Sequence, residues 1–136
     1  MPSFRYTVDI AATPDEVWAV LGDLTSVVRW IPGVTSAART DTGRRCTFAD
    51  GHVQNEQILD YSPDIRSYRY VIDGAPLPVR DNTGRFAVED IDGGARVVWD
   101  SSFIPLDPAK GDEVARMWEP FLPLMLDNLK NLVEKR

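Results

Sequence analysis

The side chain best suited to chemistry in this sequence is the carboxyl group of Glu56. Glu56 alternates with Ile58 along a β-rich run, so both side chains are expected on the apolar face of a strand. A carboxyl group in an apolar environment resists ionisation and can act as a general acid or base. If it lies beside Arg44 or Arg45, it forms a structural ion pair instead. We expect a structural or ligand-orienting role, and the residue types leave the catalytic alternative open.

Two tyrosines form a second group of candidates. Tyr68 and Tyr70 alternate on a later β-rich run, so their rings share one face and their hydroxyls need hydrogen-bond partners. We expect Tyr68 to pack in the core and Tyr70, further along the strand, to contact a ligand. Glu56 and Tyr70 are therefore the candidates for proton transfer if the protein is an enzyme.

Other kinds of site lack the residues that they need. A single cysteine, Cys46, excludes an intramolecular disulfide, and a single histidine, His52, excludes zinc sites built from several Cys or His ligands. The sequence contains no Gly-rich phosphate loop, no serine-nucleophile elbow and no carboxylate cluster at metal spacing. We expect neither a metal nor a cofactor.

Composition and charge restrict the partners. The 136 residues are 43% hydrophobic, which supports one domain over residues 1–136, and the formal charge of -6 repels nucleic-acid phosphates and anionic lipids. No apolar stretch approaches the ~20 residues that span a bilayer, and the first residues lack the pattern of a signal peptide. We expect a cytoplasmic monomer or homodimer that binds no nucleic acid and does not insert into membranes.

The first third of the chain predicts one strand and two short helices. Residues 4–10 alternate between apolar and polar, which is typical of a strand with one wet face. Residues 13–16, Thr-Pro-Asp-Glu, supply an N-cap, a first-turn proline and a Glu at the third helical position, and the helix should end near Gly22. Residues 25–30 predict a second short helix.

Residues 34–106 change to the period of β-structure. Turn sequences divide this region into six runs, and the connections are too short for helical crossovers. An antiparallel meander is therefore expected. Residues 108–136 return to a helical period with one apolar side, and Pro120 and Pro123 predict a kink or break within that helix.

These elements predict an α+β domain. The predicted sheet is curved and has one apolar face, and the predicted long helix has one apolar side. Both surfaces are buried when the helix lies across the concave face of the sheet. The bulky residues that meet there either pack solidly or enclose a pocket.

Several short segments of the sequence together resemble a known family. In chain order they are residues 12–18 (Ala-Thr-Pro-Asp-Glu-Val-Trp), residues 30–34 (Trp-Ile-Pro-Gly-Val), residues 43–45 (Gly-Arg-Arg), Asp50-Gly51, Glu56, residues 77–79 (Leu-Pro-Val) and Val98-Trp99. They resemble the polyketide cyclase/dehydrase branch of the START-related (SRPBCC, birch-pollen-allergen-like) helix-grip superfamily over nearly the whole chain. The resemblance implies a seven-stranded antiparallel sheet around a C-terminal helix, two small helices after the first strand, and a hydrophobic cavity. Relatives commonly carry an aromatic residue where this chain has Asn82.

The expected ligand contacts come from both facing surfaces. They are Trp30, Glu56, Tyr70, Asn82, Trp99, Phe103, Met117, Phe121 and Met125. The turn at Asp50 and Gly51 and the loop with Pro76, Leu77 and Pro78 are expected to flank the cavity mouth, as the resemblance to hormone receptors of the superfamily implies.

Three functions remain open from the sequence. The favoured one is a binding or carrier domain for a small hydrophobic molecule, lipid-like or polyketide-like, since no convincing catalytic set is present. The second is a polyketide cyclase, aromatase or dehydratase in which Glu56 or Tyr70 transfers protons. The third is a protein-interaction module with a vestigial cavity.

Overall fold

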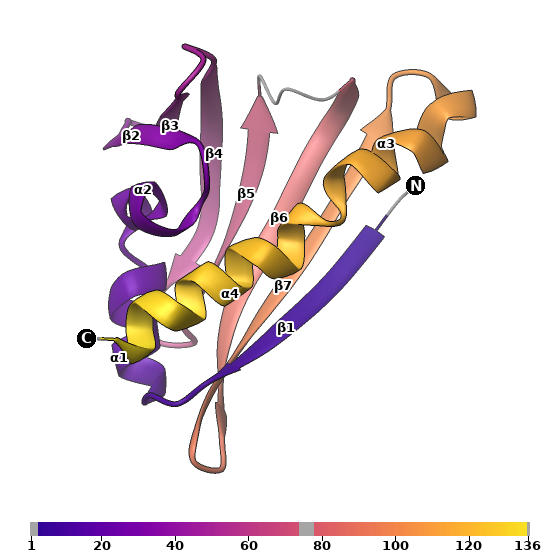
Figure 1. The fold of residues 1–136 in the computed structure, drawn as a ribbon. Coiled ribbons are helices and arrows are strands. Elements are labelled where there is room, and N and C mark those ends of the chain that lie inside the picture. Colours follow the sequence, from indigo (N-terminus) through magenta and orange to yellow (C-terminus); the bar gives the residue numbers. More distant parts are fainter. Residues whose placement is uncertain (1–2, 74–77, 136) are drawn as a thin grey trace.

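The computed structural model describes residues 3–73 and 78–135, which form one antiparallel sheet and a set of helices (Figure 1). The strands are β1 (Ser3–Ile10), β2 (Val34–Arg39), β3 (Gly43–Phe48), β4 (Val53–Ser62), β5 (Ser67–Asp73), β6 (Val79–Ile91) and β7 (Gly94–Pro105). They pair in the order β1-β7-β6-β5-β4-β3-β2, with every neighbour antiparallel. The predicted seven-stranded meander is confirmed.

Three short helices connect β1 to β2. They are α1 (Pro14–Leu21), the 3-10 helix η1 (Leu24–Ser26) and α2 (Val27–Trp30). Thr13 and Glu16 form the predicted capping box, in which each side chain accepts a hydrogen bond from the other residue's backbone N–H. The amide of Asn128 donates to the carbonyl oxygen of Trp30 at 3.2 Å and so links the end of α2 to the C-terminal helix.

The C-terminal region is helical and broken at the prolines. The 3-10 helix η2 (Pro108–Lys110) precedes α3 (Gly111–Trp118), and α4 (Phe121–Glu134) follows after Glu119 and Pro120. Pro120 is the N-cap of α4, where its missing N–H costs no helical hydrogen bond, and Pro123 lies in the first turn for the same reason. The predicted break is therefore present, and α3 and α4 follow one another across the molecule (Figure 1).

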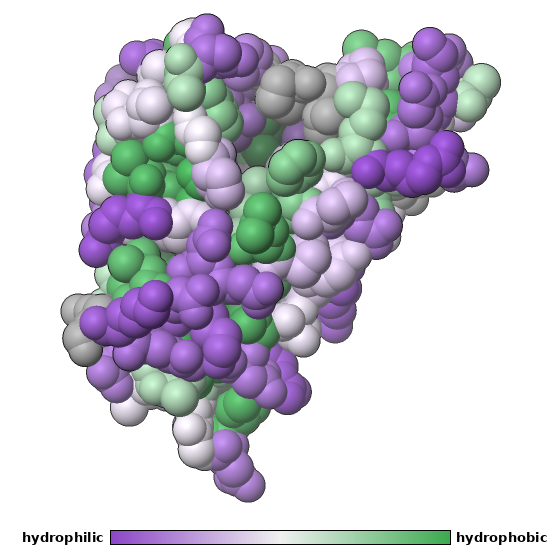
Figure 2. All heavy atoms as spheres, in the orientation of Figure 1, coloured by the Kyte–Doolittle hydropathy of each residue, from purple (hydrophilic) through white to green (hydrophobic). Residues whose placement is uncertain are grey.

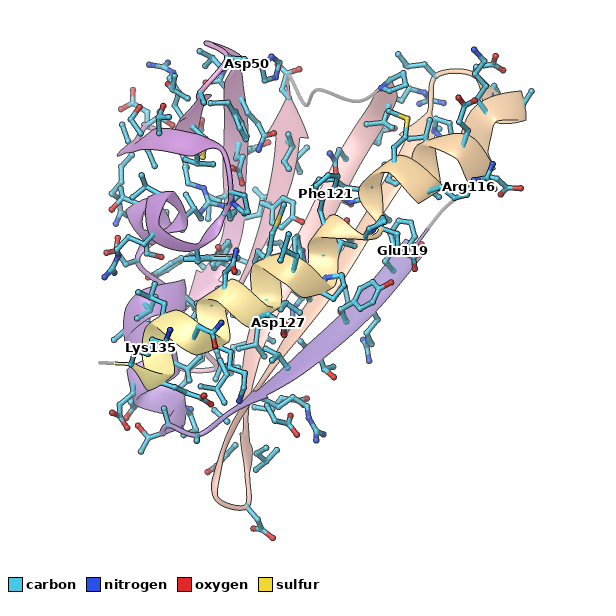
Figure 3. All side chains as sticks on the ribbon, in the orientation of Figure 1. Asp50, Arg116, Glu119, Phe121, Asp127 and Lys135 are labelled. Carbon is cyan, nitrogen blue, oxygen red and sulfur yellow. The ribbon has the colours of Figure 1, made fainter. Side chains whose placement is uncertain are left out.

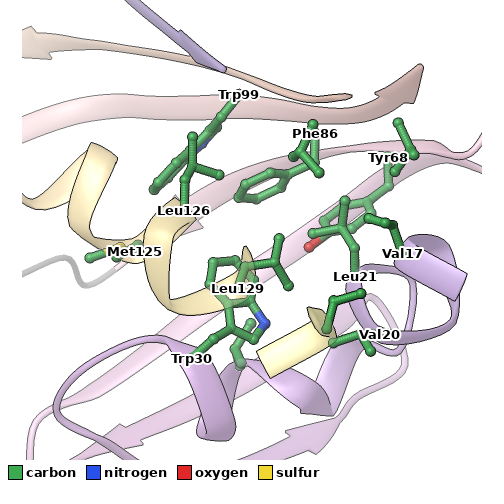
Figure 4. Packing of buried hydrophobic residues seen from close by; sticks show 14 of the residues in the cluster. Val17, Val20, Leu21, Trp30, Tyr68, Phe86, Trp99, Met125, Leu126 and Leu129 are labelled. Carbon is green, nitrogen blue, oxygen red and sulfur yellow. The ribbon is translucent and has the colours of Figure 1, made fainter. Parts of the chain in front are cut away.

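Helix α4 packs on the apolar face of the sheet. Buried aromatic residues of the sheet meet Leu126 and Leu129 of α4, and α1 closes one end of this core (Figure 4). The opposite face carries exposed ion pairs such as Arg96–Asp9 and Arg5–Asp100, both at 2.7 Å. The structure thus confirms the predicted helix-grip arrangement, with the C-terminal helix on the apolar face of the sheet. Within residues 3–73 and 78–135, no helix has the length and apolar character needed to cross a bilayer.

Candidate functional site

A buried ion pair forms the polar centre of the site. Arg44 on β3 lies directly opposite Glu56 on β4, and alternation turns both side chains toward the helix. Nη2 of Arg44 is 2.6 Å from Oε1 of Glu56, and Nε is 3.2 Å from Oε2. Nη1 donates to the carbonyl oxygen of Leu24 at 2.9 Å. The side chains are only 2% and 5% exposed, so each charge depends on the other for its stabilisation.

Two further side chains point at the same carboxylate. The amide nitrogen of Gln54 lies 3.3 Å from Oε2 of Glu56, and the thiol of Cys46 lies 3.5 Å from it. Burial raises the pKa of the Cys46 thiol to about 12, and the nearby Glu56 carboxylate adds to this effect. The thiol is therefore a weak donor here, as expected for a buried structural cysteine.

Tyr70 supplies a second polar group. Its phenol oxygen accepts a hydrogen bond from the indole nitrogen of Trp99 at 2.8 Å. Burial raises the pKa of Tyr70, so the phenol keeps its proton and can donate it in a hydrogen bond. Its ring occupies the space above Gly84, its partner on β6, where a β-carbon would collide with the phenol.

The ion pair, Gln54 and Tyr70 lie in the wall of a small cavity between the sheet and α4. Its volume is about 100 Å³. The lining residues are Ile31, Pro32, Arg44, Phe48, Gln54, Glu56, Tyr70, Ile72, Phe86, Trp99, Trp118 and Met125. The space-filling view shows the molecule hollowed between the β2–β4 side and the α3 side, with hydrophobic atoms within the hollow (Figure 2). The cavity thus combines an aromatic and aliphatic wall with one polar cluster from β3 and β4.

The structure distributes the sequence-predicted contacts over three environments. Glu56, Tyr70, Trp99 and Met125 line the cavity together. Trp30, Asn82 and Phe103 are buried outside its wall: the Trp30 ring packs edge-on against Phe86, and the Phe103 ring packs near Phe4. Met117 and Phe121 are 50% and 48% exposed on the helices.

The exposure of Met117 and Phe121 has a simple geometric cause. Helices α3 and α4 turn Val114, Trp118 and Leu122 toward the sheet, and Val114 and Leu122 are fully buried. Met117 and Phe121 each precede one of these inward-facing residues, and consecutive residues of an α-helix lie about 100° apart around its axis. Their side chains therefore point away from the sheet. Figure 3 shows Phe121 at the junction of the two helices.

The expected mouth loops are only partly described. Asp50 and Gly51 form the turn between β3 and β4, where Gly51 has a φ of 88°. Two cavity residues, Phe48 and Gln54, flank this turn, which therefore lies at the same end of the sheet as part of the cavity wall (Figure 3). Pro78 is exposed, and Pro76 and Leu77 lie outside the described residues.

Sequence reasoning missed several lining residues, although a signal for them was present. Gln54 has the same strand parity as Glu56, and Arg44 and Phe48 share the parity of Cys46. Ile72 and Phe86 likewise alternate with residues that were assigned to the apolar face. The alternation pattern does not contain the position of α4 along the sheet. That position determines which of the inward-facing residues border a cavity.

Comparisons with known proteins agree with this architecture. The sequence model of the family described as "Polyketide cyclase / dehydrase and lipid transport" matches residues 1–134. An uncharacterised protein of Mycobacterium tuberculosis is 28% identical, over 95% of this chain and 81% of its own length. The structure of Zhui aromatase/cyclase from a Streptomyces species has a TM-score of 0.82 at 18% identity, covering 99% of this chain and 94% of that one. A START superfamily protein of Mycobacterium smegmatis has a TM-score of 0.78 at 18% identity, covering 98% and 97%. The chain shares the fold of the START superfamily protein, and it belongs to the polyketide cyclase/dehydrase and lipid transport family.

Proposed function

We propose that this protein binds a small, mainly apolar molecule in the cavity between the sheet and α4. The observation that carries the proposal is the make-up of the cavity wall, where aromatic and aliphatic surface meets a buried polar cluster. Burying Arg44 and Glu56, and partly burying Gln54, costs free energy, whereas apolar residues of similar size would pack the same space without that cost. A ligand that needs orienting gives such a cluster a use.

The cavity volume limits how much of the ligand is enclosed. About 100 Å³ is less than the ~150 Å³ cavity known to take benzene and well below the ~300 Å³ at which ordinary ligand pockets begin. The enclosed part is therefore a short aliphatic segment or part of a single ring, and the remainder extends outward. Met117 lies one residue before Trp118, and Phe121 lies about one helical turn before Met125. Both therefore supply apolar surface for the part of the ligand that extends outward.

The direct test is to identify what the protein carries. Protein purified from its own host under non-denaturing conditions is analysed by native mass spectrometry, and the bound fraction is extracted and identified. We expect a mass increment from a small hydrophobic compound. Ile72→Phe, which fills the cavity, should abolish the increment, whereas Val71→Phe, at the next position on the opposite face of β5, should keep it. A ligand retained equally by both variants would exclude this cavity as the binding site.

A second candidate is catalysis of a cyclisation or dehydration in the same cavity. The specific observation that favours it is Tyr70, a protonated phenol in the cavity wall that can polarise a ketone oxygen. The family description includes cyclases, and the aromatase/cyclase neighbour shares the fold. Product analysis with linear polyketones tests this role: Tyr70→Phe should lower turnover while binding persists, and an unchanged product spectrum with and without protein would exclude it.

A further inference from the structure

The charges that border the cavity cancel one another. Among the described lining residues, Arg44 and Glu56 are the ones that carry charge, and they form a bidentate pair. Arg44 also donates to the carbonyl oxygen of Leu24, so each nitrogen of its guanidinium group already has a partner. The cavity therefore presents no spare positive charge to a ligand, although it contains an arginine.

The polar groups that remain available are neutral. Tyr70 is a neutral phenol that accepts from Trp99 and has the Ser101 hydroxyl as a second polar neighbour. Gln54 donates its amide N–H to Glu56 and is itself an uncharged lining residue. A ketone or hydroxyl oxygen that takes the place of Ser101 at the Tyr70 hydroxyl accepts from it without disturbing the ion pair. The hydrogen bond from Trp99 polarises that hydroxyl and strengthens its donation.

From this arrangement we infer that the cavity selects uncharged ligands with a carbonyl or hydroxyl oxygen and rejects carboxylates of the same shape. The inference rests on the proposed binding function and assigns the ligand class. A carboxylate would lose its hydration on entry and would meet the buried carboxylate of Glu56. It could recruit Arg44 only by displacing Glu56, which would leave that group buried without its partner.

The test uses a pair of one-ring probes of nearly equal shape, acetophenone and benzoate, titrated against the protein at pH 7 and followed by NMR. Ligands of this size are expected to bind with an affinity on the order of millimolar. We expect acetophenone to shift the Trp99 indole signal and to bind at least ~10-fold more tightly than benzoate.

A charge variant gives the sharper contrast. Glu56→Gln removes the negative partner and leaves the Arg44 charge facing the cavity, so benzoate should gain at least ~10-fold and match or exceed acetophenone. In the double variant Arg44→Gln with Glu56→Gln, both charges are absent and this gain should disappear. Thermal unfolding of each variant shows that the protein is folded before titration.

A measurement on the unaltered protein covers the case in which Glu56→Gln does not fold. If only the neutral acid enters, the apparent affinity for benzoate should rise nearly tenfold for each pH unit as the pH falls toward the pKa of benzoic acid, while that for acetophenone stays constant. Equal binding of both probes at pH 7 would overturn the inference and leave the binding function intact. Absence of binding by either probe to the folded protein would count against the binding function itself.

Discussion

Gly84 of β6 leaves open the space that the ring of Tyr70 fills from β5. The two residues are cross-strand partners, and a β-carbon at position 84 would overlap the phenol group of Tyr70. Any larger residue there must push the ring away from its hydrogen bond with Trp99. The position of the Tyr70 hydroxyl therefore depends on the absence of a side chain one strand away.

Gly84→Ala should accordingly destabilise the protein through Tyr70. We expect a loss of about 1–3 kcal/mol, the usual cost of overpacking a core, measured by urea unfolding. Gly111→Ala is the matched control, because a β-carbon there would lie at an ordinary 3.4 Å from Pro105, and it should change stability little. In a Tyr70→Ala background the cost of Gly84→Ala should vanish. A cost that persists in that background would contradict the assignment to Tyr70.

Cys46 should be inert in the folded protein. Its side chain is buried, and its pKa of about 12 leaves almost no thiolate at pH 8. A thiol reagent such as Ellman's reagent should modify it at a rate limited by unfolding, and should react completely within minutes in 6 M guanidinium chloride. The free thiol of glutathione, which is exposed, serves as the reference. Fast modification of the native protein at a rate comparable with this reference would contradict the buried placement.

Two phenylalanines proposed as ligand contacts should differ sharply in their effect on stability. Phe103 has no exposed surface, so Phe103→Ala should cost about 3–5 kcal/mol. Phe121 is 48% exposed, so Phe121→Ala should cost less than about 1 kcal/mol, although it removes apolar surface beside the cavity. Denaturant unfolding of the two variants measures the contrast. Similar losses in both would mean that Phe121 is packed more deeply than the structure places it.

The Glu134 carboxylate should contribute a pH-dependent part of the stability. The backbone N–H of Ala11, at 2.9 Å, and then Lys130 hold the pKa of Glu134 below its usual 4.5. A pKa lowered by folding stabilises the protein fully above about 4.5, and this stabilisation is lost as the pH falls through the lower, folded value. Glu134→Gln should therefore weaken the decline in stability between about pH 5 and pH 3.

The comparison for this pH effect is Asp127→Asn, which alters an exposed acid on the same helix (Figure 3). Thermal unfolding across the pH range should show a shallower slope for Glu134→Gln than for Asp127→Asn. Identical slopes for the three proteins would exclude a coupling between Glu134 and the backbone of Ala11.

Much of the fold follows from local patterns in the sequence. The alternation in residues 4–10, the capping box after Thr13 and the return to a helical period after residue 108 each specify an element by short-range stereochemistry. The short turns then leave an antiparallel meander as the topology. Proline chemistry likewise predicted the break before α4, because an interior proline removes a helical hydrogen bond wherever it occurs.

The details of the site depended on long-range geometry. The sequence left Arg44 and Arg45 as alternative partners of Glu56, and the register of β3 against β4 decided between them. Arg44 lies opposite Glu56 on the inner face, whereas Arg45 is directed outward and donates to Asn55. A shift of one residue in that register would have exchanged the two, since neighbouring strand residues point to opposite faces.

The cavity wall was decided by how the helices sit on the sheet. The sequence showed that Met117, Phe121 and Met125 share the apolar side of a helix, and the structure buries Met125 while leaving the other two half-exposed. The apolar side is broader than the surface that the sheet can cover, so the packing of Val114 and Leu122 determines which row faces inward. Periodicity identifies an apolar side, but the rotation of a helix about its axis is set by contacts with residues far away in the sequence.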